Sequence, residues 1–422
     1  MATAQPATGA APPEAVGPAH VGVVSFLAAR AAPTGGFRIA LAGGVALARV
    51  AERRGARLGF GASAAAMLET VAIIGPARFG VPLTQALSAP ILGRLHARGV
   101  GFWPQFAACA LVRVLHNAAT TAFFIWVIAG GLEAYAGTYD AIGRRVGLEV
   151  GAADAIALTV ASLLLWAAFA GTVQVLVYGR GLRTWDSGSD ERQLRGVSDR
   201  RWSGIVPEND PIPDHLARFD PRAVTLSAAV AFALLLGSTE WVFLAAMAGW
   251  LAVAWALSRA DPEPLRAGLA FAAILATGAF VFALGGGLGL DVAIRRAIRA
   301  ALLVLAATWL RAAAGAAGLR EVSRRVLGRL RRVPSATEAA AVLDGIASEG
   351  RLADAARRLG ALLSEAPKRP RELLDAALAW VVHESGAFEA APAGRPRALH
   401  ARPADLALLA SAAAPLLAIA LG

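Results

Sequence analysis

The stretch LRAAAGAAGLREVSRRVLGRLRRVP, residues 310–334, follows an apolar run of transmembrane type and carries seven arginines. Aliphatic side chains recur along it at steps of three and four, which places them on one helical face; they are Leu319, Val322, Val326, Leu330 and Val333. The sequence therefore predicts a membrane span that continues into a cationic amphipathic helix. Such a helix is typical either of a positive-inside signal that ends a span or of a docking helix for a cytoplasmic partner, and both interpretations stay open here.

The composition of the chain is that of an integral membrane protein. Hydrophobic residues make up 57% and charged residues 17% of the 422 residues, and the mean hydropathy is +0.55, well above the values of a soluble domain. The net charge of +11 does not indicate nucleic-acid binding, because the arginines flank apolar segments and form no basic domain with aromatic residues. The single cysteine, Cys109, excludes an internal disulfide, and the six scattered histidines predict no structural metal site.

The N-terminal residues 1–35 are rich in Ala, Pro and Gly and lack the basic start and apolar core of a secretory signal. We expect them to form a disordered cytoplasmic tail. The spans themselves must then direct the chain to the membrane. The Ala- and Arg-rich, Lys-poor usage indicates the inner membrane of a bacterium.

Residues 36–179 predict an N-terminal membrane helical module. Its apolar segments are residues 37–50, 60–74, 81–95, 106–132 and 152–178. The first three are short for a span, which needs about 20 apolar residues, and Pro82 and Pro90 predict breaks or kinks in the third. The last two segments are therefore predicted to cross the membrane, whereas the first three are re-entrant, tilted or interfacial, and the number of spans in this half stays open. Residues 180–214, rich in Asp, Ser, Gly and Pro, predict a cytoplasmic linker.

Residues 215–310 predict a four-span membrane core. Its apolar segments are residues 223–236, 241–257, 265–284 and 292–310. Arginines flank one set of turns and are missing from the other, as the positive-inside rule requires. Arg295, Arg296 and Arg299 depart from this pattern, and we expect a shifted span boundary there; the alternatives are side chains that snorkel outward or line a polar interior.

Beyond Pro334 the pattern predicts amphipathic helices, so that residues 311–385 form a cytoplasmic helical segment. Ser335 and Glu338 have the spacing of a capping box at the start of the first helix. Residues 386–422 predict coil and a marginal apolar segment whose topology stays open. The fold class predicted is an all-α, polytopic integral membrane protein with a cytoplasmic amphipathic helical segment.

Polar side chains inside the apolar segments of the first half predict an intramembrane polar site, because they are costly in hydrocarbon unless they face one another or a cavity. These residues are Glu69, Gln85, Arg113, His116 and Asn117. Cys109, Arg113 and His116 share one helical face, which leaves open an intramembrane thiol enzyme with His as base and Arg stabilising an oxyanion. A structural polar cluster, or a pore or substrate contact, is the other interpretation, and no catalytic residue is assigned.

Several motifs in the second half resemble one family of transporter subunits. HLARFDPR at residues 215–222 precedes two short apolar spans, AATWLR ends the fourth span at residues 306–311, and LREV and LGRLRRVP follow at residues 319–322 and 327–334. In this order and spacing, over about residues 215–365, they are similar to the transmembrane T component of energy-coupling factor transporters. Asp220, Pro221 and Arg222 match the element with which members of that family enter the membrane.

The resemblance implies a scaffold that holds a substrate-binding membrane subunit and transmits movement from ABC-type ATPase subunits. The first half could then be a fused or adapted substrate-binding module. The arginines that would contact the ATPase are Arg320, Arg324, Arg325, Arg329, Arg331, Arg332, Arg351, Arg357 and Arg358. The chain has no Gly-x4-Gly-Lys-Ser/Thr phosphate loop, so we expect no cofactor in it and ATP hydrolysis by a partner. A membrane scaffold without a transport role is a further alternative.

Overall fold

A computed structural model describes residues 13–31, 36–78, 82–145, 147–187, 219–258, 262–330, 332–365, 369–388, 399 and 402–416. Every regular element within these ranges is helical. Six helices are long and apolar enough to cross a membrane: Ala56–Ile74, Phe102–Ala129, Ala152–Trp185, Trp241–Ser258, Pro264–Gly285 and Leu290–Arg329. The chain is a multi-pass helical membrane protein, as predicted.

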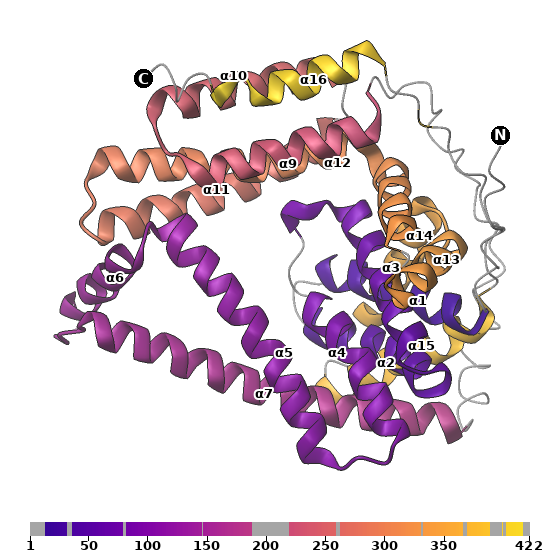
Figure 1. The fold of residues 1–422 in the computed structure, drawn as a ribbon. Helices are drawn as coiled ribbons and strands as arrows, with labels where there is room; N and C mark the ends of the chain where they lie inside the picture. The colour runs from indigo at the N-terminus through magenta and orange to yellow at the C-terminus, as the bar shows by residue number, and fades with distance from the viewer. Residues whose placement is uncertain are drawn as a thin grey trace.

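The helices form three bodies, which Figure 1 shows arranged around a central opening. A helical bundle contains α1 (Pro13–Ala31), α2 (Gly36–Arg54), α3 (Ala56–Ile74), α4 (Pro82–Ala97), α13 (Pro334–Gly345), α14 (Glu349–Glu365) and α15 (Pro370–Ala387). A long arm consists of α5 (Phe102–Phe123), the π-helix η2 (Phe124–Ala129), α6 (Leu132–Arg145) and α7 (Ala152–Ser187). The membrane core contains α9 (Pro221–Gly237), α10 (Trp241–Ser258), α11 (Pro262–Gly285), α12 (Leu290–Arg329) and α16 (Pro403–Ala413). The short 3-10 turn η1 (Pro76–Arg78) follows α3.

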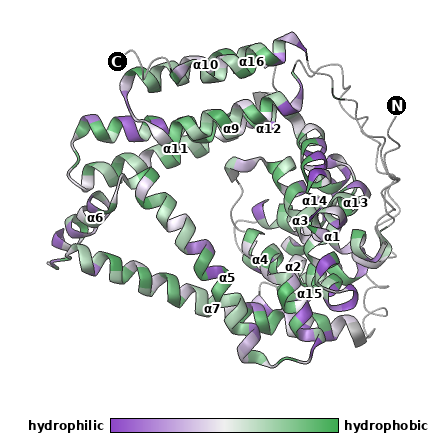
Figure 2. Cartoon of the chain, viewed as in Figure 1, coloured by the Kyte–Doolittle hydropathy of each residue, from purple (hydrophilic) through white to green (hydrophobic). Residues whose placement is uncertain are grey.

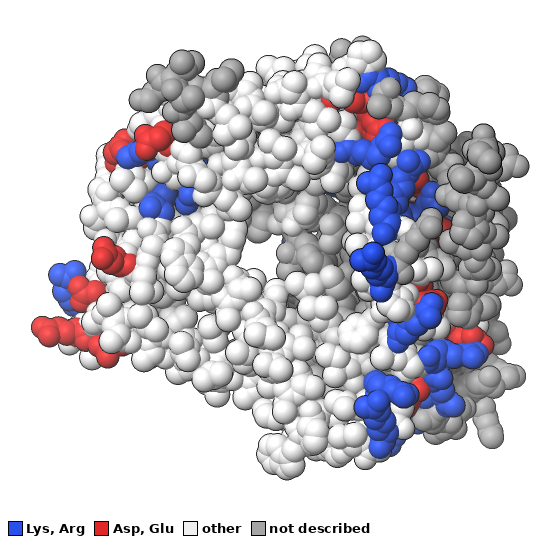
Figure 3. Space-filling model, viewed as in Figure 1, with Lys and Arg blue, Asp and Glu red and all other residues white. Residues whose placement is uncertain are grey.

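The surface of the arm and the core is that of a protein in lipid. Figure 2 shows that hydrophobic residues predominate along their helices. Leu165 of α7 is 74% exposed and Ile274 of α11 is 68% exposed. Figure 3 shows Lys and Arg gathered in a row on the bundle side, while the middle of the molecule is uncharged and a second charged group lies at the α6 end. This distribution agrees with spans that run from the α6 end to the bundle side.

The predicted disordered tail is wrong for residues 13–31, which form α1. Val21, Val24 and Phe26 of α1 are completely buried in the main core of the bundle. That core also contains Leu343 of α13 and Leu359 of α14. Helices α2 and α3 pack on α1 as well, but α13 and α14 lie more than 300 residues away in the sequence, and local composition could not reveal them. The rest of the predicted tail, residues 1–12 and 32–35, lies outside the described residues.

The N-terminal module and the C-terminal amphipathic helices, predicted as separate units, share this core. The predicted linker also starts too early, because α7 continues to Ser187, and residues 188–214 lie outside the described part of the chain. The marginal apolar segment near the C-terminus begins in α16, which packs on α9 and α10 in the membrane core.

Helix α12 connects the membrane core with the bundle over 40 residues. It bends at Gly315, whose φ of 68° and ψ of 162° belong to a region open essentially to glycine alone. The helix ends at Arg329, and α13 begins with Pro334 at its first position after Val333. The predicted capping box, with Ser335 as the N-cap, is therefore wrong. Pro334 is already the first residue of α13, a position where the backbone N–H that proline lacks would have no partner within the helix.

The arginines early in the fourth span lie within α12, which begins at Leu290. Arg296 donates to the carbonyl oxygen of Gly130 at 3.1 Å, and Arg299, which is 6% exposed, donates to that of Val127. These carbonyls lie at the end of the π-helix η2, where the helical hydrogen bonding is irregular. The arginines line a polar interior and fasten the arm to the core.

Candidate functional site

The best-connected polar region lies where α12, beyond its bend, meets the bundle. Arg320 of α12 donates from Nε and Nη2 to the two carboxylate oxygens of Glu69 on α3, at 2.6 and 2.5 Å. The carboxylate of Glu69 is 1% exposed. Arg320 also donates to the carbonyl oxygens of Ala347, at 2.7 Å, and Ile346, at 3.4 Å. One guanidinium thus joins α12 to α3 and to the loop between α13 and α14.

A second arginine fastens the same helices on the membrane side of the bend. Arg311 donates from Nε to the carbonyl oxygen of Ile73 at 2.7 Å and from Nη2 to Glu349 at 2.5 Å. Its side chain is 17% exposed. Gly315 lies between Arg311 and Arg320, so the bend in α12 is held on both sides by contacts to the bundle.

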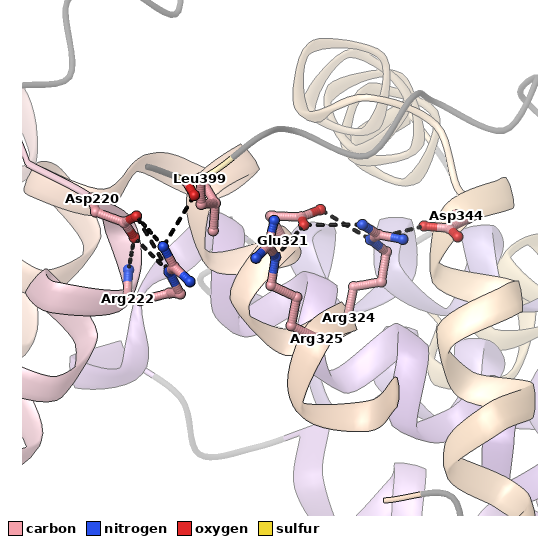
Figure 4. A network of polar contacts seen from close by, with 7 residues as sticks. All are labelled: Asp220, Arg222, Glu321, Arg324, Arg325, Asp344 and Leu399. Carbon is pink, nitrogen blue, oxygen red and sulfur yellow. Dashed lines mark hydrogen bonds and ion pairs between the residues drawn. The ribbon is translucent and has the colours of Figure 1, made fainter. Parts of the chain in front are cut away.

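A third group of charges follows on α12. Glu321 accepts hydrogen bonds from Arg324 at 2.9 Å and from Arg325 at 2.6 Å, and Arg324 approaches Asp344 of α13 at 3.8 Å (Figure 4). Burial, together with the charge of Glu321, raises the pKa of Asp344 although Arg324 acts to lower it. Two of the arginines predicted to contact an ATPase, Arg324 and Arg325, therefore have acidic partners within the chain, which partly neutralise their charge.

The Asp-Pro-Arg element lies beside this group, as Figure 4 shows. Asp220 caps α9 by accepting from the backbone N–H of Arg222 at 2.8 Å, and its carboxylate pairs with the Arg222 guanidinium at 2.8 Å. The backbone N–H of Asp220 donates to Asp405 of α16 at 2.7 Å, and Arg222 donates to the carbonyl oxygen of Leu399 at 3.2 Å. The element therefore ties the start of α9 to the C-terminal segment.

Burial would raise the pKa of the Asp220 carboxyl, but the hydrogen bonds and charge of Arg222, with a contribution from Arg325, hold the pKa below its usual value. Asp220 is thus a carboxylate at neutral pH, and Pro221 supplies the first residue of α9.

The surface predicted to bind a cytoplasmic partner, on the helices of residues 311–385, is only partly exposed. The apolar side of α14 is buried against α1, through Leu352, Leu359 and Leu363. By contrast, the last turn of α12 and the residues after it leave large apolar side chains exposed: Val326 at 52%, Leu330 at 47% and Val333 at 48%. Of the predicted coupling arginines, Arg329, Arg332, Arg351 and Arg357 are exposed, Arg357 pairs with Asp354, Arg358 is half-buried, and Arg331 lies outside the described residues.

The polar residues predicted in the first half do not form one site. Glu69 belongs to the α12 junction, whereas Arg113 of α5 lies in a separate buried cluster. Arg113 donates to Gln174 of α7 at 2.9 Å, and Gln174 donates to Ser88 of α4 at 2.5 Å. Gln85 joins through its neighbour Thr84, which donates to it at 2.8 Å and whose carbonyl oxygen accepts from Ser88.

His116 and Asn117 follow Arg113 along α5 and are half-buried. Gln174 and Ser88 were missed by the sequence interpretation, because nothing local marks them and only the packing of α4, α5 and α7 brings them to Arg113.

The geometry gives no support to a thiol enzyme. Cys109 is a free thiol with no exposed surface, and His116 lies seven residues further along the same helix. Within the described ranges, no three His, Cys, Asp or Glu side chains gather as a metal site would require.

Comparison with protein-family models, with curated proteins and with solved structures finds no match to this chain.

Proposed function

We propose that this chain is a transmembrane scaffold of an ATP-driven importer of the energy-coupling factor type in the inner membrane of a bacterium. In this proposal it transmits movement of ABC-type ATPase subunits to a substrate-binding membrane module, which the first half of the chain supplies or holds. The observation that carries the proposal is the path of α12, which leads from Leu290 in the membrane core, through the bend at Gly315, to Arg329 beside the bundle.

The bend of α12 at Gly315 supports a role in coupling. Arg311 before the bend and Arg320 after it are both fastened to α3 and to the α13–α14 region. A force applied to the free end of α12 therefore reaches the bundle through the contacts of Arg320 and Arg311, and reaches the core through α12 itself. A scaffold that only anchored a partner would not need this connection.

The end of α12 is the proposed contact with the ATPase. Val326, Leu330 and Val333 are exposed beside Arg329 and Arg332, and we name these five residues the coupling end. Apolar anchors fit a groove on a partner while arginines add oriented charge-assisted hydrogen bonds. A thiol enzyme does not account for an exposed apolar and cationic surface at the end of a membrane helix, and a scaffold without transport would bind a partner other than an ATPase there.

The test is copurification of the tagged chain from native membranes, with mass spectrometry of the proteins that accompany it. We expect an ABC-type ATPase with the wild-type chain and at least a tenfold lower yield of that ATPase with the double variant Val326→Asp, Leu330→Asp. Leu148→Asp is the matched control. Leu148 is 61% exposed and lies between α6 and α7, at the end of the arm away from the bundle. Preparations that contain the chain in good yield and no ATPase would overturn the proposal.

A further inference from the structure

Arg113 is a buried cation without a counter-charge. Its residue is 3% exposed, and among the described Asp and Glu residues none forms an ion pair with it. The guanidinium makes one hydrogen bond, from Nη2 to the side-chain oxygen of Gln174, while its Nε–H is buried and has no partner. Buried charges in proteins are normally paired, because an isolated charge loses its hydration without compensation.

The surroundings orient this guanidinium rather than neutralise it. Gln174 is fixed in turn by its bond to Ser88, and the ring of Phe37 lies 5.5 Å from the Arg113 carbon that bears the charge. A cation over an aromatic face is stabilised, but the ring supplies no acceptor for the N–H groups. The one hydrogen-bond acceptor that the protein gives Arg113 is therefore a neutral amide.

Two further donors nearby are also without partners. The hydroxyl of Tyr178 on α7 is buried and makes no hydrogen bond of good geometry, although it lies close enough to Gln174 and Arg113 to interact with both. The side-chain nitrogen of Asn117, one turn beyond Arg113 on α5, is likewise buried and unpaired. Unpartnered buried polar groups are rare in folded proteins, and a buried cation with unpaired donors beside it and no described carboxylate in contact favours an acceptor from outside the chain.

We propose that Arg113 and Tyr178 bind a small monovalent anion, either a halide or the carboxylate group of an organic acid, where α5 and α7 of the arm enter the bundle. Such an anion supplies the missing negative charge and accepts from the Arg113 Nε–H and the Tyr178 hydroxyl. A guanidinium held by Gln174 on one edge presents its remaining N–H groups in a fixed plane, which suits a carboxylate or a halide. This site is independent of the coupling end of α12.

The experiment measures thermal unfolding of the purified full chain in detergent, in sodium isethionate at constant ionic strength. Isethionate, a sulfonate that is neither a halide nor a carboxylate, is replaced stepwise by chloride in one series and by acetate in another, which separates the two anion sources. We expect a saturable rise in Tm of several degrees in at least one series, because a ligand that binds only the folded state stabilises it. Arg113→Gln should abolish the rise. Arg144→Gln, at an exposed arginine of α6, is the matched control and should behave as the wild type.

Tyr178→Phe keeps the ring and tests the site if Arg113→Gln does not fold. Loss of one hydrogen bond to an anion should raise the concentration for half of the effect about tenfold. The proposal is overturned if neither anion raises the Tm of the wild type, if Arg113→Gln responds like the wild type, or if Tyr178→Phe leaves the half-effect concentration unchanged.

Discussion

Arg320 and Glu69, 251 residues apart in the sequence, form a two-pronged ion pair that joins α12 to α3 with one partner almost completely buried. The arginine was expected to face a cytoplasmic partner and the glutamate an intramembrane site. The structure pairs them with each other. The cationic helix is therefore, over its first turns after Gly315, an internal joint, and only its end is free to meet another protein.

Removing one member of this pair should destabilise the protein strongly. Glu69→Leu leaves the Arg320 guanidinium without its counter-charge, and we expect a loss of about 3 kcal/mol in the free energy of unfolding. The double variant Glu69→Leu, Arg320→Leu should lose clearly less than the sum of the single variants, because no unpaired charge remains. Chemical denaturation in detergent measures all three, and additive losses would show that the pair is not coupled.

The bend in α12 should depend on the backbone of Gly315. Gly315→Ala places a Cβ on a residue with φ of 68° and ψ of 162°, and we expect a loss of about 1–3 kcal/mol in stability from that strained backbone. Gly328→Ala is the control in the same helix, because a Cβ there meets nothing within 4 Å. That control should be neutral or stabilise by up to about 1 kcal/mol. Equal effects of the two substitutions on Tm would contradict the strained bend.

The attachment of α16 should depend on Asp405. This carboxylate is 2% exposed and accepts from the backbone N–H groups of Asp220 and Arg402, both at 2.7 Å. Asp405→Ala leaves the buried N–H of Asp220 unpaired, and we expect a loss of about 1–3 kcal/mol. Asp405→Asn retains one acceptor oxygen and should lose less. Thermal unfolding of the two variants gives the order, and an Asn variant as unstable as the Ala variant would show that charge rather than hydrogen bonding matters.

His20 should make the bundle sensitive to acid. Burial, and the charge of Arg358 on α14, lower the pKa of His20 to about 3, and its ring stacks on Phe388 at 4.0 Å. Between pH 6.5 and about 3, His20 is protonated in the unfolded chain and neutral in the folded chain. The free energy of unfolding therefore falls as the pH falls over this range. His20 changes the free energy of unfolding by up to about 1.4 kcal/mol per pH unit in this range, and its contribution is constant above pH 6.5.

The measurement is the Tm of the wild type and of His20→Phe between pH 7.5 and 4.5. His20→Phe keeps a ring against Phe388 and removes the titration, so its Tm should fall less steeply with acid. Parallel curves for the two proteins would contradict a buried neutral His20.

The spans and the α-helical class could be predicted because hydropathy is a local property. An apolar segment of sufficient length has few stable alternatives to a membrane helix, and α9 to α12 occupy the positions expected for the four-span core. Helix α1 could not be predicted in this way, since its alanines, valines and glycines give little local signal and become part of a core when α2, α3 and residues 342–381 pack on them.

The candidate sites divide in the same manner. The sequence identified Arg113, Glu69 and Arg320 as charges that need an explanation, because charge near hydrocarbon is costly wherever it lies. It could not identify their partners. Ser88 and Gln174 are ordinary polar residues in helices far apart along the chain, and nothing in their spacing connects them to Arg113.

By itself, the sequence determined that this protein crosses the membrane several times and that α12 leaves the membrane as a cationic helix, since both follow from side chains that are neighbours along the chain. Tertiary structure alone decided which charges are satisfied internally and which remain open. Arg320 is neutralised by Glu69, Arg113 keeps its charge unpaired, and the coupling end of α12 stays exposed. The physical reason is that the energy of a charge depends on what lies within a few ångströms in space, and long-range packing sets those neighbours.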